Sequence, residues 1–240
     1  MSQPFPLPAC CPRLSDCCPL PCLPAGAVFV AAGFDPQRLS PYDFAVCGIE
    51  APASIQRSVA KRQSEFLAGR LCAREAMHRL DGRVRVPALG DDRAPVWPSD
   101  LCGSITHSTG RAAAIVAPRT AWRGLGMDME QMLSVERATR LCGEILTPAE
   151  TSRLREGYEA LQITLTFSAK ESLFKALYPL MGVRFYFEDA ELLEWSTDGR
   201  ARLRLLTDLS DDWARGSELD AQFGLHDGHL LSLVTVPLGA

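Results

Sequence analysis

Two acidic residues alternate with apolar residues in the segment 125–130, at a spacing that suits metal chemistry. In a β-strand, residues i and i+2 lie on one face, about 6.5–7 Å apart. Asp128 and Glu130 then point the same way, while Met127 and Met129 point into packing. Carboxylate oxygens are ligands that suit Mg²⁺. The spacing therefore predicts a shared cation site, although it also fits a surface strand whose polar face is in water.

A third acidic residue lies within an apolar stripe of a predicted helix. At about 100° per residue, one face of this helix is formed by Phe167, Glu171, Phe174 and Tyr178. An ionised carboxylate in that position is costly unless it is paired, protonated or bound to a metal. Lys170 and Lys175 flank the stripe on either side. A cation held by Glu171 and the two acids of the strand, with both lysines facing phosphate oxygens, would satisfy every charge. An internal Glu–Lys pair is the alternative.

A long predicted helix, over about residues 53–80, carries mostly basic charge. Its basic residues are Arg57, Lys61, Arg62, Arg70, Arg74 and Arg79. Arg62 and Arg70 are about 80° apart around the axis and about 12 Å apart along it, so they reach one phosphate only by converging on it. Arginine suits phosphate because its planar fork donates two parallel hydrogen bonds. A solvated basic face explains the same pattern.

The segment 103–108 alternates as a strand does and ends in small polar residues around a histidine. His107 can donate to a phosphate, or it can be an ordinary hydrogen-bonded histidine at the end of a strand. Arg93, in the preceding loop, is a further candidate for a phosphate contact. The chain has no G-x-S-x-G nucleophile elbow, so the nearby serines do not indicate a hydrolase.

The composition describes an ordinary globular chain. Of its 240 residues, 47% are hydrophobic and 22% are charged, and the net charge of −4 gives no general reason to expect binding to nucleic acid. No apolar run approaches the ~20 residues of a membrane span. The prolines near the N-terminus do not fit a signal peptide, which favours a cytoplasmic location.

Five of the nine cysteines lie in the proline-rich first 25 residues: Cys10, Cys11, Cys17, Cys18 and Cys22. No histidine accompanies them, and their spacing fits no familiar zinc pattern. We therefore favour reduced thiols in a poorly ordered or loosely packed arm over a metal or redox cluster.

These residues must be positioned by a mixture of helices and strands. Strands are expected at 27–32, 103–108, 112–117 and 125–130. Helices are expected at 53–80 and from the Thr147–Glu150 capping box onward. A further helix is expected at 161–177, and Pro179 would end it. Asp198-Gly199 and Asp227-Gly228 are typical of hairpin turns. The fold class is α+β with antiparallel pairing, divided into an arm at 1–25 and two halves at 26–120 and 121–240.

In their order along the chain, these segments resemble the 4′-phosphopantetheinyl transferases of the surfactin-synthetase and enterobactin-synthetase type. The resemblance covers roughly residues 40–195. Its motifs are Ala60-Lys61-Arg62, Phe66-Leu67-Ala68-Gly69-Arg70, Arg93-Ala94-Pro95-Val96-Trp97-Pro98, Ser104-Ile105-Thr106-His107-Ser108, Gly126-Met127-Asp128-Met129-Glu130 and Phe167-Ser168-Ala169-Lys170-Glu171-Ser172-Leu173-Phe174-Lys175. Phe167 replaces the tryptophan of many relatives, and Met127 and Met129 replace their commoner branched residues.

The resemblance implies a pseudo-twofold pair of similar halves, each a small, mainly antiparallel sheet with a long helix, and an active site in the cleft between them. It implies a monomer that moves phosphopantetheine from coenzyme A to a serine of apo acyl carrier proteins or peptidyl carrier domains, releasing 3′,5′-ADP. Such carriers serve fatty-acid, polyketide, siderophore and nonribosomal peptide synthesis. Mg²⁺ would be the metal cofactor.

The resemblance also implies a role for each matching residue. The Mg²⁺ ligands would be Asp128, Glu130 and Glu171, and the catalytic residues Glu171 and Lys175. Coenzyme A contacts are implied for Arg62, Arg70, Arg93, Thr106, His107, Asp128, Lys170 and Lys175. Within that set, Arg62 and Arg70 would hold the 3′-phosphate. Either Glu171 or a water that it orients would be the base for the serine proton.

Two other functions fit the same residues. One is another magnesium-dependent phosphodiester or phosphoryl-transfer enzyme, which would act without a carrier protein. The other is a catalytically inactive module that binds carrier proteins and uses the acids only structurally.

Overall fold

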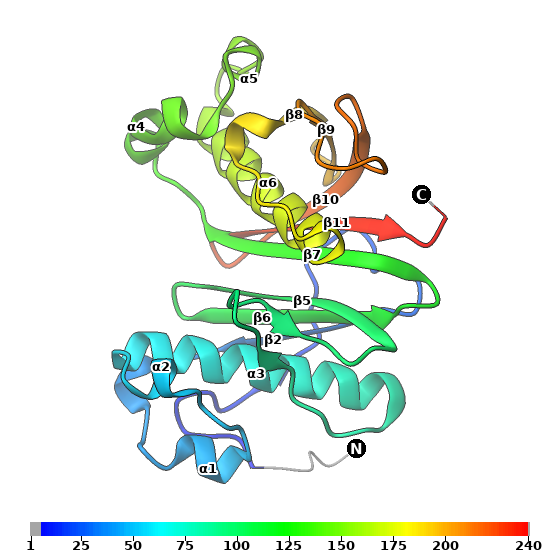
Figure 1. Ribbon diagram of the computed structural model, residues 1–240. Helices are drawn as coiled ribbons and strands as arrows, with labels where there is room; N and C mark the ends of the chain where they lie inside the picture. Colours follow the sequence, from blue (N-terminus) through cyan, green and yellow to red (C-terminus); the bar gives the residue numbers. More distant parts are fainter. Residues whose placement is uncertain (1–5, 240) are drawn as a thin grey trace. The chain divides into compact units, whose positions relative to one another are not determined.

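A computed structural model describes residues 6–239 and has the predicted α+β class, with antiparallel sheets (Figure 1). The chain forms two compact units. Of the described residues, unit 1 contains 6–18 together with Ala25–Ala121, and unit 2 contains Pro19–Pro24 together with 122–239. Across the described residues, none of the helices combines the length and apolarity that a membrane crossing requires. The cytoplasmic location stays a prediction.

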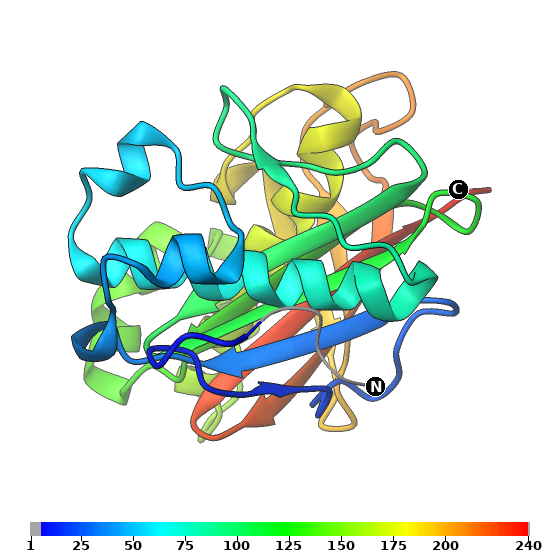
Figure 2. The same cartoon turned by 90° about the horizontal axis from the view of Figure 1, so that it is seen from below.

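Unit 1 is a four-stranded sheet covered by one long helix. The strand order is β1 (Leu14–Ser15), β2 (Val28–Gly33), β6 (Arg111–Pro118) and β5 (Leu101–Ser108), and all neighbours are antiparallel. The helix α3 (Ala60–Asp81) lies along this sheet (Figures 1 and 2). The smaller elements are η1 (Pro36–Arg38), α1 (Asp43–Cys47), α2 (Ala53–Gln56), β3 (Ala88–Leu89) and β4 (Pro95–Val96).

The prediction of one helix over 53–80 is wrong at its start. The chain forms α2, leaves the helical conformation at Val59, whose ψ is 156°, and then begins α3. The Gln63 side chain stabilises this break, because its Nε2 donates to the carbonyls of Gln56 at 3.2 Å and Ser58 at 2.7 Å. The C-terminal end is as expected, since α3 stops at Gly82 with a φ of 76°.

Unit 2 is a five-stranded antiparallel sheet with a long helix packed against it (Figure 1). Its strands are, in order, β7 (Trp122–Gln131), β11 (His229–Pro237), β10 (Glu218–His226), β9 (Arg200–Leu205) and β8 (Ala190–Trp195). Its helices are α4 (Val135–Ile145), α5 (Pro148–Ser152), α6 (Glu159–Met181) and η2 (Phe187–Asp189). Both predicted hairpins are confirmed, and so is the Thr147–Glu150 capping box.

The prediction that Pro179 stops the last long helix is wrong. The helix α6 continues through Pro179 to Met181 and ends at Gly182, whose φ is 69°. A proline here removes only one hydrogen bond of the final turn. Leu177 is fully buried, and Met181 packs against the same core, so packing keeps this turn helical.

The helix α6 approaches β7 very closely because glycines face it. A Cβ atom added to Gly126 would lie 1.9 Å from the carbonyl oxygen of Ser172. We predict that Gly126→Ala lowers the free energy of unfolding by about 2–3 kcal/mol, because the helix must move away from the strand. Urea denaturation measures this loss.

Gly143 in α4 is the matched control for that substitution, because a Cβ atom there would have no neighbour within 4 Å. Gly143→Ala should stabilise the protein by up to about 1 kcal/mol, the difference in helix propensity between the two residues. Equal effects of the two substitutions would contradict the close approach.

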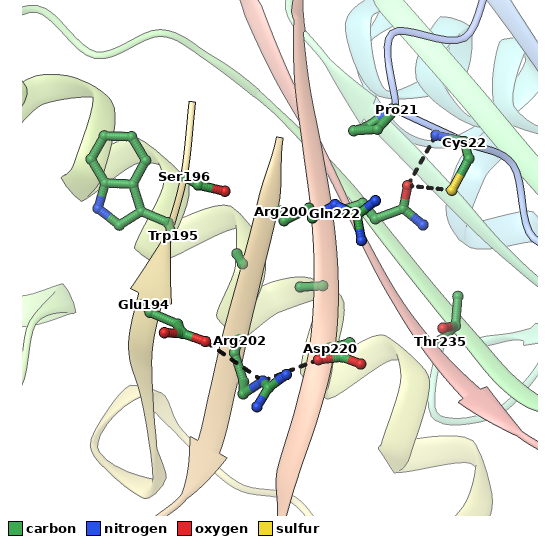
Figure 3. Close-up of a pocket in the computed structure, with 12 residues that line it drawn as sticks. Pro21, Cys22, Glu194, Trp195, Ser196, Arg200, Arg202, Asp220, Gln222 and Thr235 are labelled. Carbon is green, nitrogen blue, oxygen red and sulfur yellow. Dashed lines mark hydrogen bonds and ion pairs between the residues drawn. The ribbon is translucent and has the colours of Figure 1, made fainter. Parts of the chain in front are cut away.

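The N-terminal segment is more ordered than the loosely packed arm that the sequence suggests. Pro19–Pro24 is part of unit 2, where Leu20 is only 7% exposed. Both the backbone N–H and the thiol of Cys22 donate to the side-chain oxygen of Gln222, at 3.1 and 3.3 Å (Figure 3). Proline-rich sequence prevents regular structure here without preventing packing.

The first two cysteines of this segment lie in the core of unit 1. Cys10 and Cys11 are 1% and 0% exposed. Burial raises the pKa of both thiols to about 12, with Asp43 adding to the effect at Cys10. Both thiols are therefore protonated and unreactive at neutral pH. None of the nine cysteines, which all lie within residues 6–239, forms a disulfide.

Candidate functional site

The acids of β7 and α6 form one cluster within unit 2. Asp128, which is 4% exposed, has the same strand parity as Gly126 and so points toward α6. From α6, the Lys175 ammonium donates to Asp128 Oδ1 at 2.6 Å and to the carbonyl of Met127 at 3.3 Å. Glu171 lies one helical turn before Lys175. The close contact of helix and strand therefore holds a carboxylate and an ammonium in a direct ion pair.

The electrostatics show that the other two acids belong to the same cluster. Burial, and then the charge of Asp128, raises the pKa of Glu130 to about 7, and Glu171 contributes in the same direction. Burial also raises the pKa of Glu171, with Lys175 opposing the shift and Asp128 adding to it. The three predicted metal ligands are thus close enough to repel one another, and Lys175 is their common counter-ion.

This cluster fits a divalent cation by its chemistry. Its oxygen donors are carboxylates, which Mg²⁺ prefers, and a cation would reduce the repulsion that raises the pKa values of Glu130 and Glu171. Within residues 6–239, however, no three His, Cys, Asp or Glu side chains are gathered in a ready coordination geometry. The metal site therefore stays a prediction.

Lys170 does not lie beside Lys175, which corrects its predicted phosphate contact. Its side chain is 2% exposed, and its ammonium pairs with Glu150 Oε2 at 2.7 Å. The ammonium also donates to the carbonyls of Ile145 at 3.0 Å and Phe187 at 2.8 Å. All three N–H donors of Lys170 are therefore used. The two lysines have different surroundings because helical geometry turns residues 170 and 175 to different sides of α6.

A second, basic cluster lies within unit 1, between α3 and β5. The Nη1 atom of Arg62 lies 2.9 Å from His107 Nε2. Arg70 is 5% exposed, and its guanidinium lies 4.6 Å from the centre of the Phe66 ring. Burial, and then the charge of Arg62, lowers the pKa of Arg70 to about 10, so Arg70 stays charged at neutral pH and is repelled by Arg62.

The basic cluster retains hydrogen-bond donors for an anion. Arg70 donates from Nη2 to the carbonyl of Ala88 at 3.3 Å, but its buried Nε finds no acceptor among the described residues. A phosphate would supply such an acceptor and would also separate the two guanidinium charges. Arg62 thus contacts His107, and its charge also acts on Arg70, an arrangement of charges that suits a phosphate.

Two further predicted coenzyme A contacts, Thr106 and Arg93, also lie in unit 1. Thr106 is 2% exposed and alternates with His107 along β5, so its side chain points from the opposite face of the sheet. Arg93 lies at the tip of the β3–β4 hairpin with a φ of 72°, where its N–H donates to the carbonyl of Gly90 at 2.9 Å. Thr106 therefore does not face Arg62, whereas Arg93 belongs to the hairpin whose Ala88 carbonyl accepts from Arg70, and the coenzyme A contacts of Thr106 and Arg93 stay predictions.

Both clusters fall within segments that match known families. A family model described as the 4′-phosphopantetheinyl transferase N-terminal domain matches residues 50–117, and one described as the 4′-phosphopantetheinyl transferase superfamily matches residues 124–234. The chain belongs to the 4′-phosphopantetheinyl transferase superfamily. The first match contains the basic cluster and the second contains the acidic cluster, so the predicted family and transferase class are confirmed.

Individual relatives agree with this membership. Enterobactin synthase component D of Escherichia coli (strain K12) is 37% identical over 174 residues, which cover 72% of this chain and 80% of the relative. The 4′-phosphopantetheinyl transferase PptT of Mycobacterium tuberculosis is 37% identical over 182 residues, covering 72% of this chain and 76% of the relative. The 4′-phosphopantetheinyl transferase Npt of Nocardia iowensis is 34% identical over 148 residues, covering 61% and 66%.

Two surface cavities lie among the described residues, one in each unit. In unit 2, a cavity of about 540 Å³ lies over β8, β9 and β10, where Arg202 is placed between Glu194 and Asp220 (Figure 3). In unit 1, an open groove of about 560 Å³ is lined by Phe44 and mostly small or apolar neighbours. Neither contains a predicted site residue.

Two acids of this transferase escaped the sequence-based site prediction. Glu65 lies in the basic cluster, and the signal for it was its position as an isolated acid among the basic residues of α3. Glu150 was identified only as part of a capping box. Its pairing with Lys170 depends on tertiary contact between α5 and α6, which no local pattern reveals.

Proposed function

We propose that this transferase moves phosphopantetheine from coenzyme A to a serine of an apo acyl carrier protein or peptidyl carrier domain, with Mg²⁺ as cofactor. The observation that carries the proposal is the buried cluster in which Lys175 contacts Asp128 beside Glu130 and Glu171. Because similar chains include enterobactin synthase components, carriers of siderophore synthesis are the first substrates to test.

Unit 1 would bind the nucleotide end of coenzyme A. Arg62 and Arg70 would hold the 3′-phosphate, since the charge of Arg62 acts on Arg70 and the buried Nε of Arg70 has no acceptor among the described residues. His107 contacts Arg62 at 2.9 Å and would help to orient its guanidinium group toward the phosphate. Because Thr106 points from the opposite face of β5, we do not assign it to this phosphate.

Unit 2 would act on the diphosphate. Asp128, Glu130 and Glu171 would hold Mg²⁺, which, when bound, supplies charge neutralisation at the phosphates. The carrier serine forms a bond to the phosphorus that bears pantetheine, and the bond from that phosphorus to 3′,5′-ADP breaks. Lys175 would stabilise the charge that develops on the leaving oxygen. Glu171, or a water that it orients, would accept the serine proton.

Mass spectrometry of a carrier protein tests this function. The purified protein is incubated with coenzyme A, MgCl₂ and a panel of apo-carriers, with EDTA replacing MgCl₂ as the control. The expected result is a mass increase of one phosphopantetheine group that EDTA abolishes. Cleavage of coenzyme A without a carrier would favour another phosphodiester enzyme, and carrier binding without a mass increase would favour an inactive module.

The raised pKa of Glu130 predicts how stability depends on pH without metal. Its folded-state pKa of about 7 exceeds the ordinary value of 4.5, so the folded chain holds this proton more tightly than the unfolded chain. The contribution of protonated Glu130 to stability is therefore lost as the pH rises from 4.5 through about 7. Because Mg²⁺ needs the deprotonated carboxylate, MgCl₂ should raise the Tm more at pH 8 than at pH 6.

Thermal unfolding with MgCl₂ or EDTA at the two pH values measures this difference. Glu130→Gln is the control, since an amide does not titrate, and it should remove most of the pH dependence of the Mg²⁺ effect. The same Tm shift at pH 6 and pH 8 in the parent protein would contradict the assignment of Glu130 as a ligand.

A further inference from the structure

An acidic residue lies inside the basic cluster of unit 1, where phosphate binding alone does not explain it. Glu65 projects from α3, and its side chain is only 11% exposed. Its Oε2 atom lies 3.5 Å from Arg62 Nη1 and 3.8 Å from His107 Nδ1. A carboxylate at this place repels an incoming phosphate, so its presence calls for a second role.

We propose that Glu65 is a positioning residue that holds Arg62, directly and through His107, in the orientation that receives the 3′-phosphate of coenzyme A. This inference rests on the proposed function, and it adds to it a residue that does not itself touch the phosphate. A carboxylate and a phosphate both lack N–H donors, so Glu65 acts through its two neighbours.

The contacts among these three residues assign the hydrogen on the histidine. Arginine has only donors, so the 2.9 Å contact makes His107 Nε2 the acceptor and leaves the ring hydrogen on Nδ1. Nδ1 is the ring nitrogen that faces Glu65. The carboxylate therefore favours one tautomer and one ring orientation, as an acid does when it orients a catalytic or ligating histidine.

Glu65 also acts on the arginine pair. The Arg62 side chain is 38% exposed, so without a partner in the protein it would sample many rotamers in solvent. Arg62 and Arg70 also repel each other, which contributes to the lowered pKa of Arg70. A negative charge beside Arg62 offsets that repulsion and keeps the guanidinium near Arg70 before the ligand arrives. Preorganisation of this kind lowers the entropic cost of binding.

Kinetics with two co-substrates test this role. For Glu65→Gln we expect the KM for coenzyme A to rise about tenfold while kcat stays within about twofold of the parent. The KM for 3′-dephospho-coenzyme A, which lacks the phosphate, should not change. The variant should therefore lose most of the parent's preference for coenzyme A, an effect that general loss of structure does not produce.

The same helix offers a matched control. Glu75 has an equally buried side chain, 11% exposed, and pairs with Arg79 at 2.8 Å, one helical turn along α3. Glu75→Gln should leave both KM values at the parent level. Glu65→Asp, which restores the charge, should recover part of the affinity. In an Arg62→Ala background, Glu65→Gln should have a much smaller effect than alone, because Glu65 acts through Arg62.

Calorimetry with 3′,5′-ADP separates this inference from the proposed transfer reaction. Glu65→Gln should weaken binding of 3′,5′-ADP about tenfold, whether or not a carrier is modified. If the parent modifies no carrier but binds 3′,5′-ADP with this dependence, the transferase assignment fails and the role of Glu65 stands. If Glu65→Gln binds 3′,5′-ADP as the parent does, or changes both KM values equally, the positioning role is refuted.

Discussion

Replacing Glu171 by glutamine should reduce kcat for carrier modification by about 1,000-fold while the protein stays folded. The substitution keeps the size of the side chain but removes the charge that contributes to the acidic cluster. General acid–base groups contribute about 10²–10⁴ in rate, and loss of a metal ligand acts in the same direction. Single-turnover measurement of carrier mass against time gives the rate, and thermal unfolding gives the state of the fold.

The control for this experiment lies on the same helix. Glu159 is exposed in the first turn of α6, so Glu159→Gln changes the same charge far along the helix from Lys175. It should modify the carrier at the parent rate. Parent-like turnover in Glu171→Gln would remove Glu171 from the reaction and would leave the acidic cluster without its assigned function.

Replacing Lys170 by methionine should lower the free energy of unfolding by about 3–5 kcal/mol, because it leaves a buried carboxylate without its cation. Glu150 is 1% exposed and already accepts the N–H groups of Thr147 at 2.7 Å and Leu192 at 2.5 Å. Once Lys170 is removed, the charge of Glu150 has no nearby water to solvate it. Urea denaturation measures the loss.

Two further variants show whether the pair itself is responsible. The double variant Lys170→Met/Glu150→Gln should be more stable than Lys170→Met alone, because no unpaired buried charge remains. Lys61→Met replaces an exposed lysine and should stay within about 0.5 kcal/mol of the parent. A Lys170→Met protein with parent stability but a greatly raised KM for coenzyme A would restore Lys170 to the phosphate site.

The acidic cluster could be predicted from sequence because the side-chain periods of a strand and of a helix place its acidic residues. The period of two in β7 places Asp128 and Glu130 on one face. The period of 3.6 in α6 places Glu171 in a stripe that needs a partner for its charge. The same period of two also places Thr106 and His107 on opposite faces of β5, which the sequence alone could show.

Other features depend on contacts between residues far apart in the chain. The partner of Lys170 is 20 residues earlier, and the break before α3 depends on the side chain of Gln63 reaching back to two carbonyls. Local patterns describe neither. Burial of Cys10 and Cys11 is likewise set by the core that surrounds them, which a proline-rich segment does not reveal on its own.

The contact between Cys22 and Gln222 joins residues 200 positions apart, and this separation constrains how the protein is made. The ribosome synthesises Pro19–Pro24 about 200 residues before the strand β10 that binds it. Leu20 therefore stays in water until that strand has also been synthesised. Closing so long a loop is entropically costly, so docking of this segment belongs to the last stage of folding.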